Sequence, residues 1–178
     1  MKKTAILGLS LLLITAGLNA QKMNNIKTDL FSAFLRTGVI KYERAITEDI
    51  SAQLGFFYTG FTPRDSDSKL NGIGITPEFR FYLSDTPAPN GTYLAPNIRY
   101  MSLTVEDPVA NESGTLTSLS FAINLGKQVL LKDIILIDAW VGPAYAFRSV
   151  DATGEVDPGI PDINGFGIRI GLAIGVAF

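Results

Sequence analysis

The end of the chain places the strongest constraint on its fold. Residues 163–178 alternate between bulky apolar and small side chains. Successive side chains of a β-strand point to opposite faces, so this alternation predicts a strand with one broad apolar face. The opposite face holds mainly glycine and alanine, with Arg169 as its single charge. Bulky apolar residues opposite a row of small ones are typical of a strand with lipid outside and a narrow lumen inside.

The start of the chain has the three parts of a secretory signal peptide. Two lysines are followed by an apolar core over residues 5–13 and by a small-residue cleavage site that ends at Ala20. The apolar run is shorter than the roughly 20 residues that a membrane-spanning helix needs. We therefore predict a cleaved signal peptide over residues 1–20, followed by one domain over residues 21–178. Without cysteine, neither a lipid anchor nor a disulfide framework is available.

The composition of the remaining chain fits a small barrel. Removal of residues 1–20 leaves 13 basic and 17 acidic residues, a net charge of −4, which excludes the basic surface of a nucleic-acid-binding protein. The 158 remaining residues supply about eight membrane strands of ~9–11 residues with their turns. The predicted fold is all-β: an eight-stranded antiparallel transmembrane β-barrel, an up-and-down meander, in the outer membrane of a Gram-negative cell.

Eight alternating segments give the expected strands. They cover residues 25–33, 39–46, 50–60, 72–83, 92–104, 115–130, 134–150 and 163–178. With both termini in the periplasm, the short connections 47–49, 84–90 and 131–133 fall inside. The long connections 62–71, 105–114 and 151–162 fall outside. This asymmetry is the one expected of outer-membrane barrels. The long loops are therefore the predicted surface for a binding partner.

Three prolines argue against simple strands. Pro77, Pro96 and Pro143 lie inside predicted strands, although proline cannot donate a hydrogen bond to a sheet. A closed barrel has no free edge at which the missing donor is harmless. A bulge or a nearby strand end is the expected explanation.

Several short segments resemble a family of small outer-membrane β-barrel proteins of unknown function. They are NIKTDL at residues 25–30, YERA at 42–45, FRFYL at 79–83, YLAPNIRY at 93–100 and the terminal Phe178. In overall plan the chain is also similar to OmpX and to the barrel half of OmpA. The resemblance implies a signal read by the barrel-assembly machinery, formed by Ile170, Leu172, Ile174, Val176 and Phe178. It implies no substrate and no catalytic residue.

The residue types present argue against an enzyme. The chain has no histidine and no cysteine, which excludes Ser-His and Cys-His catalytic sites and ordinary zinc sites. Acidic loop residues such as Asp151, Glu155 and Asp157 could ligate Ca²⁺, but no EF-hand spacing is present and a solvated loop is the favoured explanation. We expect no catalysis, no cofactor and no metal site.

The inward face is predicted to carry a network of charges. Its ten members are Lys27, Asp29, Lys41, Glu43, Glu78, Arg80, Arg99, Asp138, Arg148 and Arg169. Six are positive and four negative, and buried charges must be paired. Arg80 with Glu78 and Arg99 forms the expected centre. The sequence thus favours a monomeric barrel with a filled lumen and a structural or surface-interaction role. The alternative is a narrow channel or a barrel that binds a small ligand.

Overall fold

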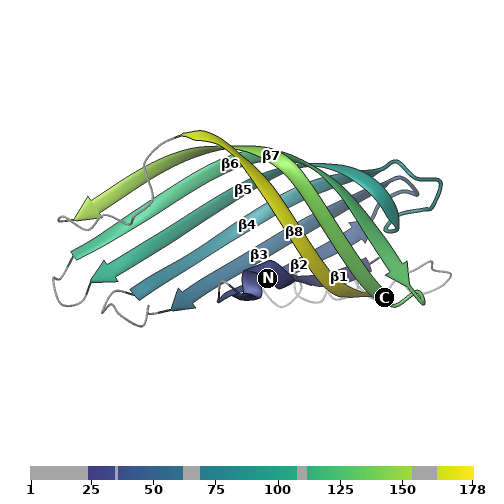
Figure 1. Ribbon diagram of the computed structural model, residues 1–178, viewed down its shortest axis with the longest axis horizontal. Coiled ribbons are helices and arrows are strands. Elements are labelled where there is room, and N and C mark those ends of the chain that lie inside the picture. Colours follow the sequence, from purple (N-terminus) through teal and green to yellow (C-terminus); the bar gives the residue numbers. More distant parts are fainter. Residues whose placement is uncertain (1–23, 35, 62–68, 108–111, 154–163) are drawn as a thin grey trace, which may run out of the picture.

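The computed structural model describes residues 24–34, 36–61, 69–107, 112–153 and 164–178 (Figure 1). The predicted signal peptide, residues 1–20, lies outside the described residues. So do most of the predicted outer connections. No helix in the described ranges is long and apolar enough to cross a membrane.

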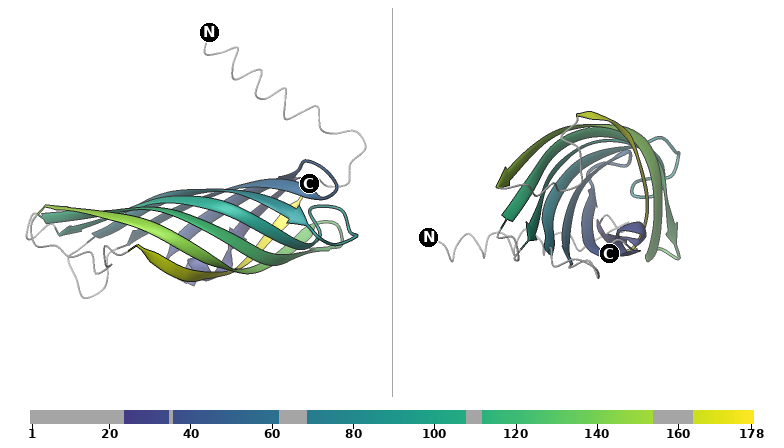
Figure 2. Two further views of the ribbon diagram at one scale, coloured as in Figure 1. Left: turned by 90° about the horizontal axis from the view of Figure 1, so that it is seen from above. Right: turned by 60° about the vertical axis from the view of Figure 1, so that its left-hand side comes forward.

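The described residues form one closed barrel of eight antiparallel strands (Figure 2). Each strand pairs with the next along the chain, and β1 pairs with β8 to close the ring. The strands are β1 (Asn24–Asp29), β2 (Thr37–Ala45), β3 (Ile50–Phe61), β4 (Lys69–Tyr82), β5 (Gly91–Asp107), β6 (Glu112–Leu131), β7 (Ile135–Thr153) and β8 (Gly165–Ala177). The predicted eight-stranded meander is confirmed.

Alternation along each strand separates a polar interior from an apolar exterior. In β6, Phe121 and Ile123 are exposed on the outside, whereas Ala122 and Asn124 are buried inside. Charged side chains on the outward face lie near strand ends in the part of the chain that the structure describes: Arg44, Lys69, Glu106, Lys127 and Asp151. The broad middle of the outer wall is therefore apolar.

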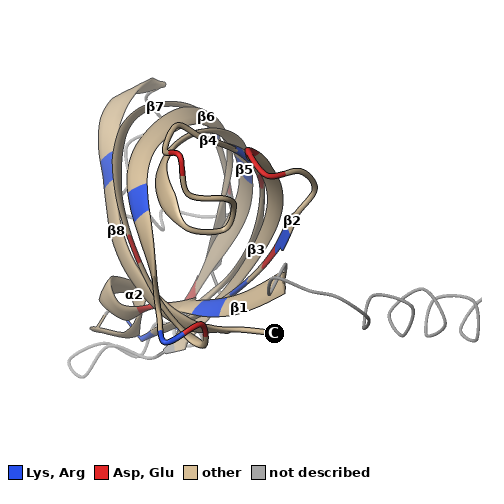
Figure 3. Ribbon diagram, turned by 90° about the vertical axis from the view of Figure 1, so that its right-hand side faces the viewer, with Lys and Arg blue, Asp and Glu red and all other residues tan. Residues whose placement is uncertain are grey.

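The end of the barrel that holds the C-terminus has both a tight hairpin and a longer turn. Lys132 and Asp133 both have left-handed φ angles, 50° and 56°, as the two central residues of a type I′ hairpin require. The longer turn between β4 and β5 folds over the barrel opening (Figure 3). Its Ala88 is 4% exposed, and the Ala88 amide donates to the Glu48 carbonyl at 2.7 Å. This turn covers one end of the interior.

The first predicted strand, residues 25–33, is too long. The chain leaves β1 after Asp29 and forms a short helix, α2 (Leu30–Phe34). The Asp29 carboxylate explains the change, because it accepts hydrogen bonds from the Ser32 amide at 3.0 Å and the Ser32 hydroxyl at 3.2 Å. An aspartate that binds an amide three residues later is a typical helix N-cap. The second strand begins two residues earlier than predicted, at Thr37 rather than at residue 39.

The shortness of β1 leaves part of the wall without a strand. β8 pairs with β1 only from Ala173 onward, and Thr37–Ile40 of β2 pair with β3 alone. Within the described residues, α2 lies against both β2 and β8 in this lateral gap. The outward side chains of β8 are more exposed beside this gap than elsewhere. Ile168 is 79% exposed, whereas Ile174, whose backbone pairs with β1, is 41% exposed.

Strands continue past their predicted ends into three of the predicted outer loops. Residues 105–107 and 112–114 pair with each other as parts of β5 and β6, within the predicted loop 105–114. Likewise β4 begins at Lys69, inside the predicted loop 62–71, and β7 continues into the predicted loop 151–162. Apolar and polar residues alternate only weakly in these segments, and for this reason the predicted strands were too short.

The three strand prolines coincide with interruptions of the sheet. Pairing between β4 and β5 is broken around Pro77 and Pro96, and pairing between β6 and β7 is broken at Pro143. All three side chains face outward and line a shallow apolar groove of about 590 Å³ with Phe121 and Tyr145. The barrel wall tolerates the missing proline N–H donors because strand pairing is interrupted locally beside them.

Gly175 is predicted to be essential for closing the ring. A Cβ at this position would overlap the Ile26 carbonyl and lie 2.9 Å from the Lys27 Cα, both backbone atoms of β1. Gly175→Ala should lower the free energy of unfolding by roughly 1–3 kcal/mol, the usual cost of overpacking. Gly167→Ala is the control, because nothing lies within 4 Å of its Cβ position. Urea unfolding followed by circular dichroism measures both, and equal stabilities would contradict this account.

Candidate functional site

Five charged residues form a compact cluster in the barrel interior. We call Lys27, Glu43, Glu78, Arg80 and Asp138 the charge cluster; each is at most 6% exposed. The Lys27 Nζ lies 2.7 Å from Glu43 and 2.9 Å from Asp138. Arg80 pairs with Glu78 at 2.7 Å, with Asp138 at 2.9 Å and with Glu43 at 3.5 Å. The residues come from β1, β2, β4 and β7, so the cluster ties together distant parts of the wall.

Neutral side chains complete the hydrogen bonds of the cluster. Glu43 accepts from the Ser51 hydroxyl at 2.5 Å and the Tyr82 hydroxyl at 2.7 Å. The Tyr93 hydroxyl donates to Asp138 at 2.7 Å, and the Gln128 amide donates to Glu43 at 3.1 Å. Buried ion pairs are tolerated only when such additional bonds satisfy the remaining lone pairs. The cluster meets that condition.

Glycines make room for the large side chains of the interior. A Cβ at Gly126 would overlap the Tyr93 ring, and one at Gly171 would overlap the Trp140 ring. An eight-stranded barrel has an interior only just wide enough for side chains. Within the glycine row that the sequence shows on the inward face of β8, Gly171 is the position that lies against a bulky side chain of the neighbouring strand.

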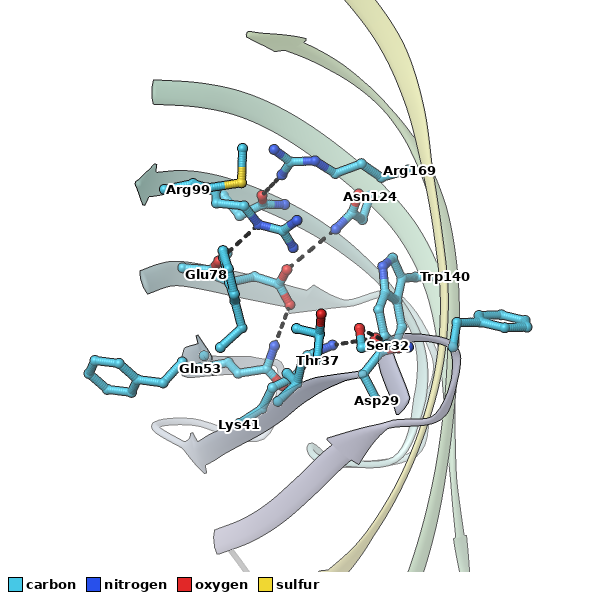
Figure 4. Close-up of a pocket in the computed structure, with 18 of the residues that line it drawn as sticks. Asp29, Ser32, Thr37, Lys41, Gln53, Glu78, Arg99, Asn124, Trp140 and Arg169 are labelled. Carbon is cyan, nitrogen blue, oxygen red and sulfur yellow. Dashed lines mark hydrogen bonds and ion pairs between the residues drawn. The ribbon is translucent and has the colours of Figure 1, made fainter. Parts of the chain in front are cut away.

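A cavity of about 620 Å³ lies between the charge cluster and the end of the barrel that carries α2. We call it the interior cavity (Figure 4). Polar and basic side chains line much of it, together with Trp140, the single tryptophan of the chain. Its volume is within the range of small-molecule sites, about 300–1,000 Å³.

Two arginines enter the interior cavity without a carboxylate partner. Arg99 Nε donates to the Thr76 hydroxyl at 3.2 Å, and Arg169 donates to the Asn97 amide oxygen at 3.1 Å and to the Ser120 hydroxyl. Neither guanidinium forms an ion pair with any described residue. Both are half-buried. The cavity therefore contains two guanidinium groups that no described carboxylate contacts directly.

The predicted interior charges separate into groups. Five form the charge cluster, and Asp29 pairs with Lys41 at 3.4 Å, with the Lys41 Nζ 3.7 Å from the centre of the Trp140 ring. Arg99, expected in the centre with Arg80 and Glu78, lies in the cavity instead, as does Arg169. Arg148 is half-buried further along β7 and does not line the cavity.

The sequence did not identify the uncharged members of the site. Ser51, Tyr82, Tyr93, Gln128 and Trp140 all occupy inward positions of their strands. Part of their signal was available, because Tyr82, Tyr93 and Trp140 lie in phase with a predicted interior charge on the same strand. Ser51 and Gln128 lie on strands that carry no predicted interior charge. An interpretation based on charge alone passed over them.

The acidic groups of the charge cluster are all engaged by other side chains. The three carboxylates of the charge cluster are held in ion pairs and hydrogen bonds. In the part of the chain that the structure describes, no group of three or more His, Cys, Asp or Glu residues is placed to hold a metal ion. What the arrangement offers is a tightly bonded layer and, beside it, a basic cavity.

Lys27 is predicted to be the most sensitive member of the charge cluster. The cluster holds three carboxylates and two cations, so Lys27→Met leaves three acids around Arg80 alone. This change should lower the free energy of unfolding by about 3–5 kcal/mol. Adding Glu43→Gln should restore part of the loss. Lys127→Met, an exposed outward position, should stay within about 0.5 kcal/mol of the unmodified protein. Urea unfolding of the four proteins would contradict the account if the double variant were less stable than Lys27→Met.

Comparison with known proteins identifies a family. The sequence matches the family described as "Protein of unknown function (DUF3575)" over residues 6–154. That range contains β1 to β7, the charge cluster and Arg99. No curated protein and no solved structure matches the chain, so no named relative supports the likeness to OmpX. Because the match covers most of the sequence, the chain belongs to the DUF3575 family of proteins of unknown function.

Proposed function

We propose that this protein is an integral outer-membrane β-barrel, exported with a cleaved signal peptide. One observation carries the proposal: the closed barrel exposes apolar side chains around its outer wall and buries charged ones inside. A water-soluble barrel has the opposite distribution. An apolar outer band around a polar interior is what a membrane barrel needs.

The role that fits the interior best is structural or surface-interacting, with neither catalysis nor open conduction. The charge cluster spans the lumen from β4 to β7 and β1, and the turn that carries Ala88 covers the adjacent end. Ions would have to break several buried ion pairs to pass. A lumen closed in this way leaves the outer connections, residues 62–71, 105–114 and 151–162, as the proposed surface for a partner.

The C-terminal strand supports the proposed route to the membrane. Ile170, Ile174, Val176 and Phe178 are exposed on the outward face of the chain end, where the barrel-assembly machinery could bind them. The Phe178 amide also donates to the Asn24 carbonyl at 2.9 Å, so the terminal residue takes part in closing the ring. We propose that the mature protein is a monomer surrounded by lipid.

A second candidate function is ligand binding. The interior cavity favours it, because a barrel filled purely for stability has no need of 620 Å³ beside two unpaired arginines. This function is compatible with a closed lumen, since the cavity lies on one side of the charge cluster.

Membrane insertion and closure are tested together. The protein should remain with outer membranes after washing with carbonate, and the unboiled form should migrate differently from the boiled form on a gel. The folded protein should give no steady, porin-sized current in planar bilayers, because the charge cluster fills the lumen. Lys27→Met serves as a comparison that weakens the cluster without changing the outer wall.

Two outcomes would overturn the proposal. Recovery as a detergent-free soluble monomer would exclude a membrane barrel. A large, stable, ion-selective current from folded protein would exclude the closed lumen and leave a channel as the better function.

A further inference from the structure

The interior cavity has the charge of an anion site. Arg99 and Arg169 enter it from β5 and β8, and their hydrogen bonds go only to neutral oxygens: Thr76, Asn97 and Ser120 (Figure 4). Each guanidinium has five N–H donors in a fixed fork that suits a carboxylate or phosphate. Two such groups beside one cavity leave several donors for a bound anion.

The acidic residues of the cavity are already committed elsewhere. Glu78 pairs with Arg80 at 2.7 Å and accepts from Gln53 at 3.0 Å and Asn124 at 3.4 Å. Asp29 pairs with Lys41 and caps α2. Neither carboxylate forms an ion pair with the two arginines, so both guanidinium groups keep donors that no described carboxylate occupies.

The cavity also reaches the outer wall through the lateral gap. Its lining includes Ile168 and Ile170, whose side chains lie on the outward face of β8, and Phe31 of α2. β8 has no strand partner there among the described residues, because β1 has already ended at Asp29. An apolar exit therefore leads from the basic cavity to the surface that lipid would cover.

We propose that the interior cavity binds an anionic amphiphile, with the carboxylate or phosphate on Arg99 and Arg169 and the alkyl chain in the lateral gap. Charge complementarity selects the head group, and the apolar residues at the gap select the tail. The inference rests on the proposed membrane location, because only there does the gap face hydrocarbon. The inference names the class of ligand for the second candidate function, ligand binding. Such a ligand would leave the ion pairs of the charge cluster intact.

Trp140 provides a built-in reporter. It lines the cavity and is the only tryptophan in the chain. A brominated fatty acid, 9,10-dibromostearate, quenches tryptophan fluorescence on contact, and its uncharged alcohol has the same tail without the head group. Titration of the purified barrel in an uncharged detergent should give saturable quenching by the acid and weak, unsaturable quenching by the alcohol.

Three variants make the test specific. Arg99→Gln with Arg169→Gln should weaken binding of the acid at least about tenfold, since hydrogen bonds to charged groups contribute strongly. Arg148→Gln, an inward arginine of β7 outside the cavity lining, should bind within twofold of the unmodified protein. The gel shift of each unboiled variant checks that it is folded. If the double variant does not fold, the single Arg169→Gln variant takes its place.

Competition separates an amphiphile from a free anion. Dodecyl phosphate should displace the brominated acid, and inorganic phosphate at the same concentration should not. Equal displacement by inorganic phosphate would overturn the amphiphile and leave a small-anion site. Equal quenching of the double variant and the unmodified protein would overturn the site altogether. Because the gel shift and membrane fractionation do not depend on ligand, failure here is distinguishable from failure of the proposed membrane location.

Discussion

The pairing of buried charges is the constraint on which this structure depends. Charges placed in a narrow eight-stranded interior must be paired, because an isolated one would cost several kcal/mol. Lys27 and Arg80 meet three carboxylates from different strands within 3.5 Å. This requirement fixes the register of the wall, since a slip of one residue would point every charge outward. The outer apolar face follows from the same register.

Much of the barrel could be predicted because a period of two is easily recognised. Strand number, order and inward phase follow from alternation, and so do the interior positions of the predicted charges. The error at residues 30–34 has a local cause: the Asp29 side chain bonds to Ser32 and turns the chain into α2. The segment still looks apolar enough for a strand, and an aspartate on the inward face looks like another lumen charge. The capping role of Asp29 depends on the position of its carboxylate relative to the Ser32 amide, which the amino-acid composition does not reveal.

The partners within the site were harder to predict than its members. Glu78 and Arg80 lie two positions apart on one strand, and their contact follows from phase alone. Arg80 of β4 meets Asp138 of β7, and this contact depends on the stagger of the strands between them. The sequence placed Arg99 beside Glu78 for the same reason that it placed Arg80 there. The register decides the outcome, because Asn97 lies opposite Glu78 and Arg99 donates to Thr76 instead.

The early end of β1 has a mechanical consequence. β1 joins β8 only over Asn25–Asp29, whereas β5 and β6 are paired along the whole of Gly91–Asp107. The circumference is therefore held by a short seam between the first and last strands of the chain. Lateral tension on the wall would part this seam first, while the long hairpins stay whole. A barrel built in this way can widen at the pairing of β1 with β8 while its other strand pairs stay hydrogen-bonded.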